Sequence, residues 1–281
     1  MTAATFTAAR AVRSPVGPAV VLAGAFLALV CAAALAPDLF ASAPDRVDPA
    51  YALRPPGADH LFGTDQLGRD VFARVVHGAR ASLLVGLGST ALAALAGSAW
   101  GLLAALGGRV ADEVCMRLAD VFLSFPSVLM ALLVVAVLGP GTRNVTIAIT
   151  IALAPGFARV VRVRGAVVRD APYVRAAVNL GVPPWRILAR HVAPNVLAPL
   201  LILATMNVGA AITAGASLSF LGLGPQPPEA EWGAMLAQSR DYFDASWTLA
   251  VFPGAAVTLT VMSVTIVGRA LQARYEGREA R

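Results

Sequence analysis

The sequence contains no lysine, so arginine supplies every basic side chain apart from histidine. The phosphate loop of many ATPases, GxxxxGK[ST], needs a lysine that reaches the nucleotide phosphates, so its absence excludes an ATPase of that type. Cysteine is also scarce, because only Cys31 and Cys115 occur, and they give neither a disulfide framework nor metal-ligand spacing. His60, His77 and His191 are equally scattered, so the sequence predicts no metal site.

Charged residues are few as well. They make up 14% of the chain, against about 25% in soluble domains, while hydrophobic residues reach 58% and the mean hydropathy is +0.72. The apolar residues are gathered in long uncharged runs, which predicts lipid as the solvent. A net charge of +6 would also suit a nucleic-acid partner, but the arginines flank the apolar runs, which favours a role in membrane topology.

Long apolar runs predict six membrane-spanning helices, because a bilayer core of about 30 Å needs about 20 helical residues. The runs cover residues 14–37, 81–106, 121–138, 145–158, 196–217 and 246–267. The fourth is short and spans the membrane only if its helix continues past Arg159, with that guanidinium reaching back to the interface. The first resembles a secretory signal in its flanks, but its length favours a retained anchor. The expected fold class is all-α integral membrane.

The arginines are shared unevenly between the two sides of such a topology. With both termini in the cytoplasm, most fall in cytoplasmic segments, as the positive-inside rule expects. We therefore expect a cytoplasmic tail, an anchor helix, an extracytoplasmic loop, a core and a second cytoplasmic tail over residues 1–13, 14–37, 38–80, 81–270 and 271–281. Late in the loop, an amphipathic interfacial helix and an ordinary turn both fit the spacing of Val71, Phe72, Val75, Val76 and Ala79.

The cytoplasmic loop over residues 169–194 has the pattern of two short helices with a break. Gly181 can end the first helix in a left-handed conformation. Pro183 and Pro184 suit the first turn of the second helix, which Pro194 is expected to close. Apolar faces are formed by Tyr173, Val174, Ala177 and Leu180, and then by Ile187, Leu188 and His191. By periodicity alone, docking on a partner and lying on the membrane surface fit equally.

The same loop resembles the EAA loop of ABC importer permeases, in which paired alanines, a glycine four positions later, and a downstream isoleucine and proline recur. The residues that carry this resemblance are Arg175, Ala176, Ala177, Gly181, Ile187 and Pro194. It implies a coupling helix seated in a groove of a separate ATP-binding subunit. The family commonly has an acidic residue where this chain has Arg175, so any ion pair at that position is changed.

Four longer stretches are similar to the C-type permease of the dipeptide, oligopeptide and nickel importers. They are HLFGTDQLGRDVFARVVHGARASLLVG, MRLADVFLSFPS, SLSFLGLGPQPPEAEWGAML and RDYFDASWTLAVFPG, at residues 60–86, 116–127, 217–236 and 240–254. The resemblance implies a type I permease of the bacterial inner membrane without an ATPase site or cofactor of its own, ATP and Mg being bound by partner subunits. The implied partners are a second permease, one or two ATPases, an extracytoplasmic solute-binding protein and the bilayer. Peptide and nickel both remain open as cargo.

A secondary carrier driven by an ion gradient is the alternative, and it is disfavoured because the clear spans have no charged residue in mid-span. Candidates for contact with the binding protein, or for bracing the extracytoplasmic gate, are Asp65, Arg69, Asp70 and Trp232. A polar group in lipid usually faces the interior of the bundle. Candidates for lining the path, or for bonding a neighbouring helix, are therefore Thr205, Asn207, Thr213 and Ser217.

Overall fold

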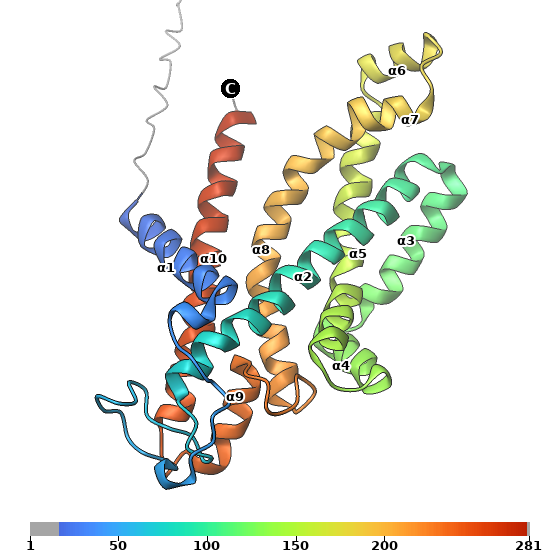
Figure 1. Ribbon diagram of the computed structural model, residues 1–281. Helices are drawn as coiled ribbons and strands as arrows, with labels where there is room; N and C mark the ends of the chain where they lie inside the picture. Colours follow the sequence, from blue (N-terminus) through green and yellow to red (C-terminus); the bar gives the residue numbers. More distant parts are fainter. Residues whose placement is uncertain (1–16, 280–281) are drawn as a thin grey trace, which may run out of the picture.

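The computed structural model describes residues 17–279, and within this range every regular element is a helix (Figure 1). The all-α class expected from the sequence is thereby confirmed. The α-helices are α1 (Pro18–Leu35), α2 (Val71–Leu106), α3 (Gly108–Ser124), α4 (Ser127–Leu138), α5 (Thr142–Arg169), α6 (Pro172–Asn179), α7 (Pro184–Ile187), α8 (Ala193–Phe220), α9 (Trp232–Ser239) and α10 (Thr248–Glu279).

Five stretches of helix are long and apolar enough to cross a membrane, and α3 with α4 adds a sixth if the pair counts as one crossing. The pair is bent by 92°. The bend falls at Phe125, which is extended because the following Pro126 disfavours a helical conformation at the preceding residue. The third span, predicted as one run over residues 121–138, is therefore divided between two helices at this bend, and the first of them begins earlier, at Gly108.

Other boundaries also differ from those expected. The stretch that begins at Val71 is the first part of the continuous helix α2, so no separate interfacial helix exists there. The helix of the fourth span does continue past Arg159, to Arg169, and the Arg159 guanidinium pairs with Asp120 of α3. Helix α10 continues to Glu279, so most of the expected tail over 271–281 is helical, whereas the tail expected over 1–13 lies outside the described residues.

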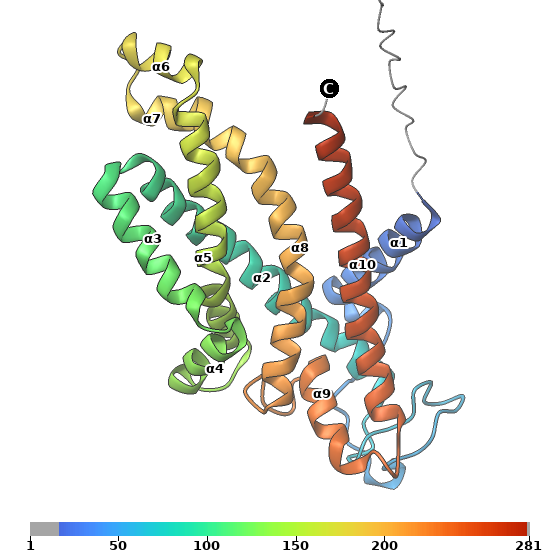
Figure 2. The same ribbon diagram turned by 180° about the vertical axis from the view of Figure 1, so that it is seen from behind.

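Helix α2 crosses the molecule diagonally and packs against both α5 and α8 (Figures 1 and 2). Glycines make this crossing possible, because a methyl group at Gly97 would lie 2.5 Å from Phe157 Cβ of α5. Gly101, one turn further on in a small-xxx-small pattern, lies equally close to α5. Helix α10 packs on α8, and α1 lies against α2 and α10.

The bundle has two different ends. The hairpin end carries α6 and α7, which project beyond the other helices, and the last turn of α10 lies at the same end (Figure 1). The cap end consists of residues 36–70 and of the segment 221–247, which contains the short helix α9. The 3₁₀ turns Pro37–Leu39 and Pro49–Tyr51 are the regular elements of the first cap segment, as its many prolines suggested.

Candidate functional site

The hairpin of α6 and α7 is closed by a Schellman motif. The N–H of Val182 donates to the carbonyl of Ala177 at 3.1 Å, and the N–H of Gly181 donates to that of Val178 at 2.9 Å. Gly181 has φ +76°, a left-handed conformation that suits glycine. The predicted end of the first helix at Gly181 is thus confirmed.

The second half of the hairpin differs from the prediction. Pro194 does not close a helix but stands in the first turn of α8, and the chain passes from α7 into α8 through a π-helical turn, η3, over Leu188–Val192. Proline offers no N–H and its ring crowds the carbonyl four residues earlier, so the helix widens just before it instead of breaking. Helix α7 of the hairpin and the fifth span are consequently one continuous helical stretch.

The inner face of the hairpin is firmly attached to the bundle. Val174, Ile187 and Val192 are buried in one apolar cluster with Phe157 and Val161 of α5. Because α6, α7 and α5 share this cluster, a force on the hairpin is transmitted to the spans through packed side chains.

The outer face of the hairpin is apolar and uncovered on this chain. Val178, Leu180 and Trp185 are 56%, 82% and 65% exposed. Ala176 is also exposed, whereas Ala177 is half-buried against the apolar cluster below. The Arg175 side chain is exposed, and its Nη2 forms only a long ion pair with Asp170 Oδ1, at 4.0 Å. Exposed apolar groups of this size, flanked by a free guanidinium, are typical of a protein-binding surface.

At the cap end, three of the four candidate residues are buried. The Asp65 carboxylate accepts from Arg69 Nε at 2.7 Å and from the backbone N–H of Leu67 and of Arg69. Trp232 is 1% exposed and donates its indole N–H to the carbonyl of Val75 at 2.8 Å. Their position supports bracing of this end and not direct contact with another protein.

Residues that the sequence did not single out complete this brace. Glu231 caps α9 and accepts from Ser82 Oγ of α2 at 3.0 Å. Arg74, 1% exposed, donates to Asp45 Oδ1 at 2.9 Å and to the carbonyl of Pro228 at 3.2 Å. Arg74 therefore joins the start of α2 to both cap segments, which are distant in sequence. In the sequence, the only sign of its burial is that apolar residues flank it in the same helical turn.

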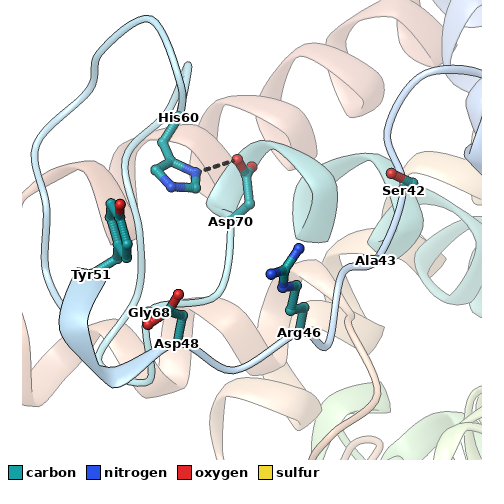
Figure 3. A pocket seen from close by; sticks show the side chains of 8 residues that line it. All are labelled: Ser42, Ala43, Arg46, Asp48, Tyr51, His60, Gly68 and Asp70. Atoms are coloured by element: carbon teal, nitrogen blue, oxygen red, sulfur yellow. Dashed lines mark hydrogen bonds and ion pairs between the residues drawn. The ribbon is translucent and has the colours of Figure 1, made fainter.

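The fourth candidate, Asp70, lies on an open cavity of about 390 Å³ at the same end (Figure 3). Its Oδ1 caps α2 by accepting the N–H of Ala73, and its Oδ2 lies 2.8 Å from His60 Nδ1. Arg46 and Tyr51 line the same cavity and come from the proline-rich segment before α2. Asp70 is thus the one candidate of this group with access to the surface.

Between α4, α5, α8 and α10 lies an open groove of about 500 Å³. Two of the candidate path residues, Thr213 and Ser217, line it, and each hydroxyl donates to its own helix backbone. Thr205 and Asn207 are not part of its wall and likewise bond to carbonyls of α8. The groove wall contains small, aliphatic and hydroxyl side chains and no ionisable group.

A bundle of membrane-crossing helices with an uncharged groove, a braced cap and a projecting hairpin is the architecture of a membrane transport subunit. Residues 97–281 match the family described as "Binding-protein-dependent transport system inner membrane component", and the chain belongs to it. It is therefore the membrane-spanning permease subunit of an ABC importer, located in the inner membrane.

Known permease subunits match this sequence over most of their length. The chain is 42% identical over 241 residues to the dipeptide transport system permease protein DppC of Alkalihalophilus pseudofirmus, covering 85% of this chain and 79% of the relative. It is 40% identical over 217 residues to the glutathione transport system permease protein GsiD of Pectobacterium atrosepticum, covering 77% and 72%. An inward-facing MetNI methionine ABC transporter shares the fold, with a TM-score of 0.57 and 18% identity over 71% of this chain and 95% of that chain.

Proposed function

We propose that this chain carries short peptides through the inner membrane, with a second homologous permease completing the path and separate ATPase subunits supplying the energy. The observation that carries the proposal is the hairpin, whose outer face is apolar and uncovered while its root is packed into the spans. The other implied partner is an extracytoplasmic solute-binding protein, which would meet the cap end.

The hairpin end faces the cytoplasm in this proposal. Arginines gather there, as the positive-inside rule requires of a cytoplasmic side, and those on the hairpin and the adjoining helix ends are Arg109, Arg169, Arg175, Arg186 and Arg190. ATP and Mg would bind to the partner subunits, and the coupling residues of this chain would be those of the hairpin, from Arg175 to Pro194.

Peptide is favoured over nickel as the cargo. The groove wall contains no His, Cys, Asp or Glu, so it offers none of the side chains that commonly bind nickel. The relatives named for dipeptide, tripeptide or glutathione transport point to the same chemical class.

The hairpin assignment is tested by co-purification. The pair Leu180→Asp and Trp185→Ala changes two exposed side chains, so the fold should survive while the recovery of ATPase with a tagged permease falls at least tenfold. Trp247→Ala is the matched control, because Trp247 is similarly exposed, at 56%, but lies at the cap end. Equal ATPase recovery from the hairpin variants and the control would refute the assignment.

A further inference from the structure

Helix α3 is linked to α5 by two ion pairs at different depths. Near the start of α3, Asp112 accepts from Arg162 Nε at 2.8 Å and also from Arg162 Nη2. Further along, Asp120 accepts from Arg159 Nη2. Asp120 lies about 18 Å along α3 from Gly108, at 1.5 Å per residue, and the chain that follows it is apolar throughout α4. The second pair is therefore closer than the first to the apolar run of α4.

The Arg159–Asp120 pair lies on the open face of α5. Phe157 and Val161 are buried in the apolar cluster formed with α2 and α8. Ala152, Gly156 and Arg159 are spaced i, i+4 and i+7, so they share the other face of the helix. Ala152 lines the uncharged groove, and nothing lies within 4 Å of the place where a side chain at Gly156 would project. Arg159 thus lies on the same open face of α5 as the groove-lining Ala152, with Gly156, which has no side chain, between them.

Both members of the pair are accessible. The side chains of Arg159 and Asp120 are 52% and 62% exposed. A charged pair beside an apolar span is costly to expose to hydrocarbon, so we expect the surface that carries this pair to face water or protein. Asp120 also lines a second open cavity, of about 390 Å³, whose wall on α3 and α5 carries charges of both signs. That cavity is lined by Asp112 and Arg162 but not by Arg159, so it does not distinguish the two ion pairs. The open face of α5 beside the groove does distinguish them.

We propose that Asp120 and Arg159 form a subsite of the translocation path that takes the two charged ends of a zwitterionic solute, in accordance with the peptide cargo proposed above. The guanidinium of Arg159 suits the planar α-carboxylate of a peptide, which it can bind through two parallel hydrogen bonds. The carboxylate of Asp120 suits the α-ammonium. While the subsite is empty, the two side chains neutralise each other, so neither is left as an unpaired charge in the membrane.

The test separates a solute subsite from a simple brace between helices. If the pair is only a brace, apolar packing can replace it, because changing an ion pair to hydrophobic residues often leaves stability unchanged. If the pair binds the charged ends of a solute, apolar residues cannot replace it. The double variant Asp120→Leu/Arg159→Leu is made in the complete transporter, reconstituted in proteoliposomes with its binding protein and labelled alanyl-alanine. Transport is expected to fall at least tenfold, while subunit assembly and binding-protein-stimulated ATP hydrolysis stay within twofold of wild type.

The neighbouring pair supplies the control. Asp112→Leu/Arg162→Leu alters the same two helices nearer their ends and is expected to leave transport within twofold. Transport that is unchanged in the Asp120 variant, or lowered equally in both, would overturn the subsite. If the leucine variant does not assemble, Asp120→Asn/Arg159→Gln is measured by the same criteria. Absence of dipeptide transport by the wild type would instead refute the proposed function, so the two failures are distinct.

Discussion

Asp65 and Arg69 show how the chemistry of single residues decides between two roles. Both were candidates for contact with a binding protein, yet the carboxylate is 5% exposed and the guanidinium side is 3% exposed. Each oxygen of Asp65 is already engaged, one with the Arg69 side chain and the other with two backbone N–H groups. A buried charge in such a setting stabilises the cap segment, because its removal would leave its partner unpaired.

Replacing this carboxylate should therefore destabilise the protein. Asp65→Asn leaves the Arg69 guanidinium buried without its counter-ion, and we expect a loss of about 3–5 kcal/mol. Thermal unfolding of the detergent-purified chain measures the effect. Asp59→Asn, at an exposed position of the same segment, should have little effect. An unchanged midpoint for Asp65→Asn, together with weaker binding-protein affinity, would restore the contact role.

The sequence revealed part of this brace and not the rest. Asp65, Arg69 and Trp232 were named as candidates within the family-like stretches 60–86 and 217–236, which also contain Arg74 and Glu231. Arg74 and Glu231 were not singled out, although they are as deeply buried. Their partners, Asp45 and Ser82, are 29 and 149 residues away in the chain, and pairings over such separations depend on tertiary packing that no local pattern encodes.

At the scale of helices, the closeness of α2 and α5 depends on glycines that leave no room for a side chain. At Gly97 an added methyl group would meet both Phe157 and the backbone carbonyl of Ala154. At Gly88, on the same helix, it would meet only Thr146 Cγ2, at an ordinary 3.6 Å. Alanine substitution at these two positions therefore separates the effect of helix packing on stability from the effect of helix propensity.

Gly97→Ala should destabilise the bundle by about 1–3 kcal/mol, because the backbones must separate to admit the methyl group. Gly88→Ala should be neutral or stabilising by up to about 1 kcal/mol, because alanine has the higher helix propensity and the space is free. Unfolding of both variants in the same detergent gives the comparison. Equal shifts of the two midpoints would show that the α2–α5 contact is not the controlling one.

Helix boundaries were predictable where the amino-acid composition changes sharply. They were not predictable where the backbone departs from regular α-helical geometry. The apolar runs located most spans, and Gly181 located the end of α6. The bend between α3 and α4 was missed because Phe125 and Pro126 lie inside the MRLADVFLSFPS stretch that introduces the apolar run 121–138. The π turn before Pro194 was missed because a proline predicts a helix end as readily as a widened turn.

On the scale of the whole molecule, the chain is one part of a larger assembly. The groove between α4, α5, α8 and α10 is open on one side, and the outer face of the hairpin is apolar and uncovered. The two ends of the bundle also differ in character, because one is a tightly hydrogen-bonded cap and the other carries free arginines and exposed apolar side chains.

This asymmetry predicts the orientation in the membrane. In a chain with Cys31 and Cys115 replaced by alanine, Asp59→Cys at the cap end should react with an impermeant maleimide in intact cells. Arg186→Cys on the hairpin should react only after the membrane is permeabilised. Both side chains are exposed, so access alone does not distinguish them. Labelling of Arg186→Cys from outside would invert the topology and remove the hairpin from the ATPase.

The unbroken helical path from Trp185 to Phe220 has a mechanical consequence. At 1.5 Å per residue it is a lever about 54 Å long. Its far part touches the cap where Gly233 of α9 packs closely on Ala216, so tilting the near end displaces both extremities together. The π turn is a soft joint in this path, since its backbone bonding is less regular, and Pro199, which has no N–H to donate, is a second. The stiffness of these joints sets how much of a movement at the hairpin arrives at the opposite side of the bilayer.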